Sequence, residues 1–238
     1  MSANPELDLF VVRVAEEVAA RLTSQALIES WTRIGEQRQL QPVTAAVARD
    51  LAQQTTPAIV VGTAYPLRAD EWPLLGPGDL ALTVDEDGAP AIVELKAGSD
   101  RNALGPCSWD ALKLAFLLQR GLITAGYLLA TAPLEIWSGE ARGCELFETT
   151  EVETLELHET FKDWFRYWER QGYPAGTTVP ARFRTERVTR VQFPLSLTKW
   201  GLRVAAVEVT DGEQLAWVLE PAASHTEASL HDDVTDER

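Results

Sequence analysis

Asp79-Leu-Ala-Leu-Thr-Val84 and Ala91-Ile-Val-Glu-Leu-Lys96 are two apolar runs on either side of the turn Asp85-Glu-Asp-Gly88. Each run has the length and composition of a strand, and the glycine that ends the turn accepts a positive φ at little cost. Gly76-Pro-Gly78 is turn material directly before the first run. The stretch therefore predicts a β-hairpin.

Helix and strand patterns surround this hairpin. Before it, apolar residues spaced by three and four predict an amphipathic helix, and a second helix follows Pro42. After it, a third helix is predicted, capped by Ser108 or Asp110 and stopped at Gly121. The predicted elements are helices at residues 5–34, 43–53 and 108–120, and strands at residues 58–62, 79–84, 91–96 and 125–131. This order predicts an α/β protein with a mixed sheet and a helix crossing one face.

The rest of the chain predicts a smaller second part. An aromatic-rich helix is expected over residues 155–171, two or three antiparallel strands over 182–209, and a final strand over 214–220. Beyond Pro221 the chain is polar and acidic, which is typical of a disordered tail. We therefore expect a core over residues 1–135, a C-terminal helix with antiparallel strands packed on it over 136–220, and a tail over 221–238.

Three residues of the hairpin carry the candidate chemistry. Side chains alternate across a strand, so Glu94 and Lys96 point to the same face, and the partner strand can bring Asp79 beside Glu94. Two converging carboxylates suit Mg²⁺ or Mn²⁺, which keep several water ligands. A nearby lysine can orient a metal-bound water or neutralise charge that develops on phosphorus. These residues supply what metal-assisted phosphodiester hydrolysis requires.

The motif Gly-Asp79, fourteen residues, Ile-Val-Glu94-Leu-Lys96 resembles that of the PD-(D/E)XK nucleases, which share the restriction-endonuclease-like fold. The resemblance implies an αβββαβ core over roughly residues 5–135. It also implies that Asp79 and Glu94 ligate the metal and that Lys96 helps to position the attacking water. Gly78 stands where many members of the family carry proline.

Other family features leave alternatives open. Some members place an acidic residue of the first helix near the metal, for which Glu16, Glu17 and Glu29 are the candidates. Many carry a polar residue on the helix after the motif, for which Lys113 and Gln119 are the candidates. The competing hypothesis needs no metal: Glu94 and Lys96 form an ion pair on a half-exposed strand, and Asp79 only opens its strand.

The formal net charge of −15 argues against a protein that coats nucleic acid generally. A local basic segment, with Glu186 as its one acidic residue, nevertheless provides candidate contacts to a phosphate backbone. Its cationic residues are Arg182, Arg184, Arg187, Arg190, Lys199 and Arg203. The alternative is that they form the solvated face of a β-hairpin.

Composition excludes several other classes of protein. The two cysteines, Cys107 and Cys144, make no zinc spacing and are expected to be buried free thiols in a reducing compartment. Apolar runs are too short to span a bilayer, and no secretory signal pattern begins the sequence, so a cytoplasmic protein without a membrane partner is expected. No Walker loop, dinucleotide fingerprint or nucleophile elbow occurs.

Three functional hypotheses remain. The first is a metal-dependent nuclease acting on DNA or RNA, with Asp79 and Glu94 as ligands and Lys96 as the catalytic base or an electrostatic aid. The second is an inactive nuclease-like module that binds or regulates within a protein assembly. The third is an enzyme for a small phosphorylated or nucleotide substrate. A homodimer or another protein partner is compatible with each of them.

Overall fold

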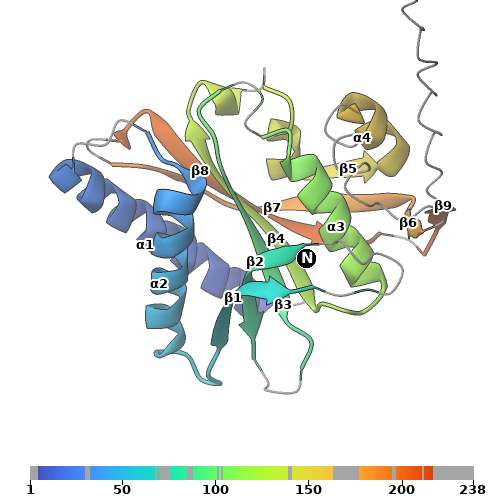
Figure 1. The fold of residues 1–238 in the computed structure, drawn as a ribbon, viewed down its shortest axis with the longest axis horizontal. Helices are drawn as coiled ribbons and strands as arrows, with labels where there is room; N and C mark the ends of the chain where they lie inside the picture. The colour runs from blue at the N-terminus through green and yellow to red at the C-terminus, as the bar shows by residue number, and fades with distance from the viewer. Residues whose placement is uncertain are drawn as a thin grey trace, which may run out of the picture.

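The computed structural model describes residues 5–29, 33–67, 69, 76–84, 88–100, 102, 104–138, 141–162, 177–194, 197–210 and 212–216. A seven-stranded mixed sheet lies at its centre, with helices on both faces (Figure 1). The mixed α/β class predicted from the sequence is thereby confirmed. The helices are α1 (Pro5–Glu29), α2 (Gln41–Ala52), α3 (Cys107–Gln119) and α4 (Thr154–Thr160), with short helical segments η1 (Glu36–Leu40), η2 (Ile136–Ser138) and η3 (Cys144–Phe147). The strands of the large sheet are β1 (Val60–Pro66), β2 (Pro77–Thr83), β3 (Ala91–Ala97), β4 (Ala125–Pro133), β5 (Thr150–Glu153), β7 (Arg182–Gln192) and β8 (Trp200–Glu208).

The strands of this sheet lie in the order β1-β2-β3-β4-β8-β7-β5. The predicted hairpin is present as the antiparallel pair β2 and β3, in which Leu80 lies opposite Val93. β3 and β4 are parallel, and α3 makes the crossover that such a pair requires. All other pairs in the sheet are antiparallel. A separate two-stranded sheet consists of β6 (Thr178–Pro180) and β9 (Gln214–Ala216).

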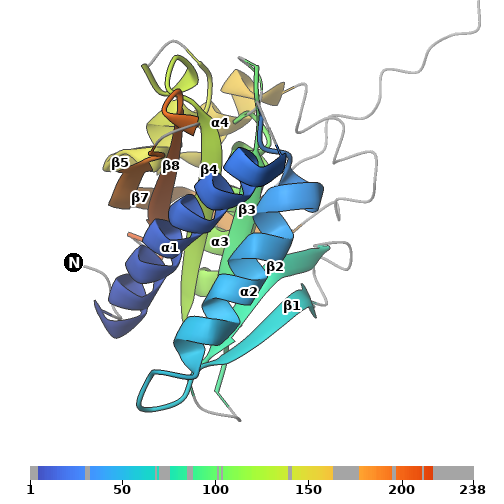
Figure 2. The ribbon, with the colours of Figure 1, turned by 90° about the vertical axis from the view of Figure 1, so that its left-hand side faces the viewer.

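Helices α1 and α2 lie side by side over one face of the sheet (Figure 2). The apolar stripe of α1 is buried against this face, and residues on the inner sides of the strands complete the same core. Full burial of each such aliphatic side chain contributes about 1.5 to 3 kcal/mol. The stripe of α1 includes Leu7, Val11, Val14, Val18 and Leu22.

Helix α3 covers the opposite face and is buried along nearly its whole length, from Cys107 to Leu117. Gly126 of β4 allows the close approach of this helix, because a Cβ atom there would lie 3.0 Å from the Cβ atom of Leu114. The helix start is thus held beside the carboxyl end of β3. Both Cys107 and Cys144 are buried free thiols, as expected.

Several boundaries differ from the prediction. The first helix was expected to continue to residue 34, but it is described only to Glu29; residues 30–32 lie outside the described part, residues 33 and 34 are not helical, and Gly35 has an extended backbone that leads into η1. The strand expected over 58–62 is β1, displaced to Val60–Pro66, because its register follows from pairing with β2, where Val60 lies opposite Thr83. Strands β5 and β6 were not predicted.

The later part of the chain extends the same sheet. β8 pairs with β4 from Gly126 to Pro133, which places the predicted antiparallel strands next to the core. The helix expected over 155–171 begins as α4, and residues 163–176 lie outside the described part. The final strand is observed as Gln214–Ala216, while residues 217–220 and the predicted tail over 221–238 also lie outside it. Within the described ranges, every helix is too short or too polar to cross a membrane.

Candidate active site at the carboxyl end of β3

Asp79, Glu94 and Lys96 lie in one region of the structure, where β2 begins and β3 ends, beside the start of α3. The Asp79 carboxylate is held from two directions. Its Oδ2 atom accepts a hydrogen bond from the backbone N–H of Leu95 at 2.8 Å, and its Oδ1 atom accepts one from the Gln41 side chain at 3.2 Å. The first bond ties β2 to β3, and the second ties the start of α2 to the site.

Lys96 contacts acidic groups on two other elements. Its Nζ atom lies 2.9 Å from Asp110 Oδ2 on α3 and 4.0 Å from Glu36 Oε1 on η1. The other oxygen of Glu36 accepts a 3.4 Å hydrogen bond from the backbone N–H of Ala97. The lysine side chain is 19% exposed, so part of it is reached by solvent.

Glu94 is buried and contacts a second lysine. Its side chain is 3% exposed, and Oε1 lies 2.8 Å from the Nζ atom of Lys113, outside good hydrogen-bond angles. Lys113 also lies 3.4 Å from Asp110 Oδ1, so Asp110 contacts both lysines. The competing hypothesis, a direct ion pair of Glu94 with Lys96, is wrong for the described residues, because Glu94 pairs with Lys113 and Lys96 with Asp110, both on α3.

The charges of the cluster act on one another. Burial raises the pKa of Glu94 to about 7; attraction by Lys113 opposes this rise, while repulsion by Asp110 and Asp79 adds to it. Burial also opposes the charge on Lys96, but Asp110 and Glu36 outweigh it and raise the pKa of this lysine. Lys96 is therefore a cation at neutral pH.

Asp110 of α3 belongs to the same charged cluster, and its side chain is buried. Burial alone would raise its pKa, yet attraction by Lys96 and Lys113 is stronger and lowers it. The sequence suggested that Ser108 or Asp110 caps α3. That prediction is wrong, because the N-cap residue of α3 is Pro106, with no side-chain hydrogen bond at the cap. The Ser108 hydroxyl instead donates a hydrogen bond to the Gly105 carbonyl, and the Asp110 carboxylate forms ion pairs with Lys96 and Lys113.

Sequence reasoning found some members of the cluster and missed others. Of the two candidates on α3, Lys113 belongs to it, whereas Gln119 lies about 9 Å further along the helix. Of the acidic candidates on α1, Glu17 pairs with Arg21, which in turn reaches Asp50 on α2. Besides Asp110, the carboxylate near Lys96 is that of Glu36, 4.0 Å away, which no motif marks.

The net charge of the cluster is negative, as a divalent cation would require, but the cluster provides few side chains that could ligate a cation. Four carboxylates (Glu36, Asp79, Glu94 and Asp110) face two lysines, which leaves two formal negative charges in excess. Across the described residues, however, no three Asp, Glu, His or Cys side chains converge in a way that could hold a metal ion. A site made by Asp79 and Glu94 would therefore provide two protein carboxylates, a number that Mg²⁺ often accepts with water completing its shell.

The predicted basic segment lies on β7, on β8 and just before β8, apart from this cluster. β7 is three strand positions from β3, roughly 15 Å across the sheet. Part of the positive charge of the basic segment is neutralised by ion pairs. Arg182 pairs with Glu153, while Arg187 and Arg203 both contact Glu148 at 2.6 Å. Among the described residues, Arg184, Arg190 and Lys199 make no ion pair.

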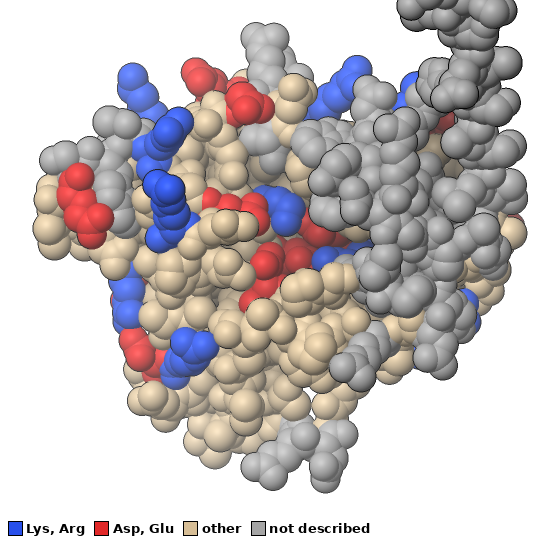
Figure 3. All heavy atoms as spheres, viewed as in Figure 1, with Lys and Arg blue, Asp and Glu red and all other residues tan. Residues whose placement is uncertain are grey.

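Arg190 and Arg203 lie directly opposite each other on the paired strands. Burial lowers the pKa of Arg203, and the neighbouring Arg190 and Arg187 lower it further, against the attraction of Glu148. Figure 3 shows that acidic and basic side chains also lie next to one another in the middle of the face seen in Figure 1, with uncharged surface below them.

Comparison with protein-family models, with curated proteins and with solved structures gives no match.

Proposed function

We propose that this protein is a metal-dependent phosphodiester hydrolase that acts on DNA or RNA. The observation that carries the proposal is that Asp79, Glu94 and Lys96 belong to one charged cluster at the carboxyl end of β3, where open α/β sheets commonly bind their ligands. Nucleic acid is the partner that this chemistry implies, and Mg²⁺ or Mn²⁺ is the cofactor.

The surrounding elements support the same proposal. From α1 to β4 the chain provides a helix, three successive antiparallel strands, a crossover helix and a parallel strand, with α2 added after the first helix. This order is the one implied by the resemblance to the PD-(D/E)XK nucleases. A resemblance in fold does not fix an activity, so the assignment depends on the site residues.

Each site residue has a role in the proposal. Asp79 and Glu94 would hold the cation, which would supply an activated water and stabilise negative charge on phosphorus. Lys96 acts as an electrostatic aid and not as a base, because Asp110 and Glu36 keep it protonated. Gln41 and the Leu95 amide fix the orientation of the Asp79 carboxylate.

Phosphate groups of the substrate beyond the cleaved one would be contacted by the basic segment, which lies apart from the cluster. Arg184, Arg190 and Lys199 are the cations of the basic segment that form no ion pair with a described residue, although Glu151 and Glu208 lie opposite Arg184 on the neighbouring strands, and Arg182 and Arg187 would add to them. Contacts to phosphate of this kind produce binding that weakens steeply with salt.

A second candidate function is a nuclease-like module without turnover. One observation favours it: Glu94 is 3% exposed and already paired with Lys113, so a cation could reach it only after this pair opens. In that case the cluster would serve as an internal network of ion pairs, and the protein would bind or regulate a partner.

The decisive experiment compares cleavage of labelled single- and double-stranded DNA and RNA with Mg²⁺, with Mn²⁺ and with EDTA. The variants are Asp79→Asn, Glu94→Gln and Lys96→Met, and the matched control is Glu156→Gln, an exposed acid on α4. Circular dichroism and urea unfolding establish that each variant is folded before its activity is compared.

The nuclease proposal expects cation-dependent cutting by the wild type and the control, and at least a hundredfold loss in the three site variants. Isothermal titration with Mn²⁺ should show binding that is lost in Asp79→Asn. If folded wild type neither cuts any substrate nor binds Mn²⁺, the proposal fails and the module without turnover becomes the better account. Cutting that survives in all three variants would also overturn the site assignment.

A further inference from the structure

A pocket lies at the other end of the β2–β3 hairpin, opposite the charged cluster. It has a volume of about 420 Å³ and is formed by the first turns of α1, the segment after α2 and the adjoining ends of the strands. Pockets that bind small molecules usually have volumes from about 300 to 1,000 Å³. The cavity is therefore large enough for a molecule of roughly 10 to 20 non-hydrogen atoms.

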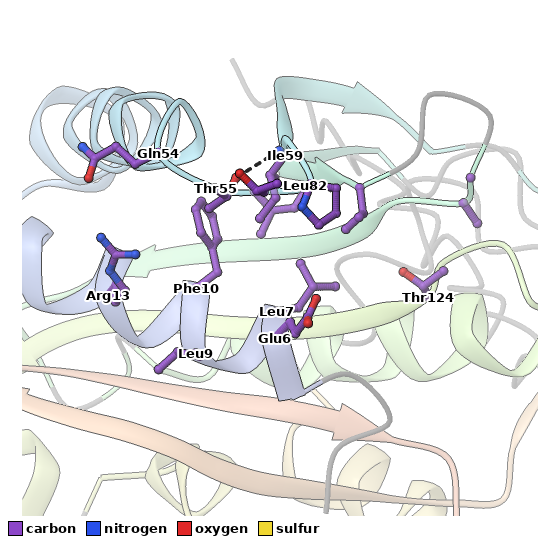
Figure 4. Close-up of a pocket in the computed structure, with 15 residues that line it drawn as sticks. Glu6, Leu7, Leu9, Phe10, Arg13, Gln54, Thr55, Ile59, Leu82 and Thr124 are labelled. Atoms are coloured by element: carbon purple, nitrogen blue, oxygen red, sulfur yellow. Dashed lines mark hydrogen bonds between the residues drawn. The ribbon is translucent and has the colours of Figure 1, made fainter.

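The walls of the pocket are mainly apolar. Phe10 of α1 points from the helix towards Ile59 and Thr55, and Leu82 of β2 lies beside them (Figure 4). Phe10 and Leu82 are buried members of the core, so their positions are fixed by packing. The Thr55 hydroxyl is already used, since it donates to the Ala52 carbonyl and accepts from the Ile59 amide. A bound molecule would meet a preformed apolar wall here.

The two ends of the pocket carry opposite charges. Arg13 and Gln54 lie at one end, and Glu6 lies towards the other (Figure 4). Glu6 and Arg13 are seven residues apart on α1, about 10 Å along the helix, which is too far for an ion pair. Within the described part of the chain, the guanidinium group of Arg13 has no acidic partner. A ligand carboxylate could supply that partner.

We propose that this pocket binds a small amphipathic monocarboxylate. Its apolar chain or ring packs between Phe10, Ile59 and Leu82, and its carboxylate contacts Arg13 and the Gln54 amide. A second anionic group at the far end is disfavoured because it would face Glu6. The proposal concerns a site separate from the charged cluster and does not depend on nuclease activity.

The test is isothermal titration of the full chain with sodium octanoate and sodium 4-phenylbutyrate at constant ionic strength. These two probes distinguish a chain from a ring as the apolar body. Octylamine and suberate serve as comparison ligands, because the first reverses the charge and the second adds a carboxylate at the Glu6 end. We expect one of the monocarboxylates to bind at least tenfold more tightly than both comparison ligands.

Two variants locate the site. Arg13→Ala should weaken binding of the preferred monocarboxylate at least fivefold, while the matched control Arg49→Ala, an exposed arginine of α2 outside the pocket, leaves it unchanged. Val84→Phe should fill part of the pocket and abolish binding, with circular dichroism to establish that it is folded. The proposal is overturned if neither monocarboxylate binds with a Kd below about 10 mM, or if both variants bind like the wild type.

Discussion

The two ends of the β2–β3 hairpin differ in what they contain. At the end where β3 finishes, acidic and basic side chains from β2, β3, η1 and α3 are closely packed, and Glu94 and Lys113 are almost wholly buried. At the opposite end, α1 and the same hairpin enclose a 420 Å³ pocket whose charges lie only at its rim. In the functions proposed above, a cation at the first end would need the ion pair of Glu94 with Lys113 to open, whereas a ligand at the second end would break no ion pair.

Among the changes that test this comparison, removal of Lys113 should have the largest effect on the free energy of unfolding. Lys113→Ala leaves the buried Glu94 and Asp110 with one cation fewer, and breaking such a pair from one side costs about 3 to 5 kcal/mol. We expect this loss in the free energy of unfolding in urea at pH 8, where Glu94 is ionised. It should shrink as the pH falls, because a protonated Glu94 no longer needs the cation.

The matched control is Lys199→Ala, which removes an exposed lysine and should change stability by less than about 0.5 kcal/mol. A loss below about 1 kcal/mol in Lys113→Ala would mean that the cluster is not a tightly coupled network.

The second prediction concerns pH. The pKa of Glu94 is raised to about 7 in the folded protein, against about 4.3 for a free glutamate in the unfolded chain. The folded state therefore holds the extra proton between these values, so the contribution of Glu94 to stability is fully present below about pH 4.3 and is lost as the pH rises through 7. Relative to Glu94→Gln, the wild type should lose roughly 1 to 3 kcal/mol over this interval.

Urea unfolding of both proteins at several pH values between 4.5 and 8 measures this difference. For the exposed control pair, wild type and Glu16→Gln, the difference should stay flat. A Glu94→Gln difference that stays flat, or that grows in favour of the wild type with rising pH, would contradict the raised pKa.

A third prediction compares a substitution to phenylalanine at each of the two ends. Leu95 is fully buried beside the cluster, whereas Val84 borders the pocket. Overpacking a filled core costs about 1 to 3 kcal/mol, so Leu95→Phe should destabilise by that amount. Val84→Phe should cost less than about 1 kcal/mol, because its added atoms enter free space. Equal losses in the two variants, measured by urea unfolding, would mean that the pocket is no more accommodating than the core.

The smallest predicted effect compares the two ends of α2. Gln41→Ala removes the side-chain donor to Asp79 Oδ1 and should cost about 0.5 to 1.5 kcal/mol. Gln54→Ala removes only a long 3.4 Å bond to the Asp50 carbonyl at an exposed position and should cost less than about 0.5 kcal/mol. Thermal unfolding should therefore show a lower Tm only for Gln41→Ala; the reverse order would contradict the role of Gln41 in the cluster.

The local part of this architecture could be predicted from the sequence. The hairpin follows from alternation and turn residues that are adjacent in the chain, so β3 and the shared face of Glu94 and Lys96 could be derived without a structure. The start of α3 was also located to within one residue. The edge strand β1 was displaced because its limits depend on pairing with β2, which is a contact between distant segments.

The charge partners could not be predicted for the same physical reason. Asp110 has the position of a residue that begins a helix, and only the docking of α3 on β3 directs it to Lys96. Glu36 lies in a short π-helical segment that carries no motif, and the insertion of β8 beside β4 leaves no local signal. The pocket likewise combines segments that are far apart in the sequence.

The hydrogen bond from the Leu95 amide to Asp79 Oδ2 makes this single N–H group a spectroscopic reporter on the carboxylate. The amide proton points at the oxygen from 2.8 Å between the donor and acceptor atoms, so its NMR chemical shift follows the electron density on that oxygen. A proton, a cation or a phosphate group that alters Asp79 will therefore move one resonance from the middle of the sheet. In a chain with many acidic side chains, Leu95 allows the state of one of them to be observed separately.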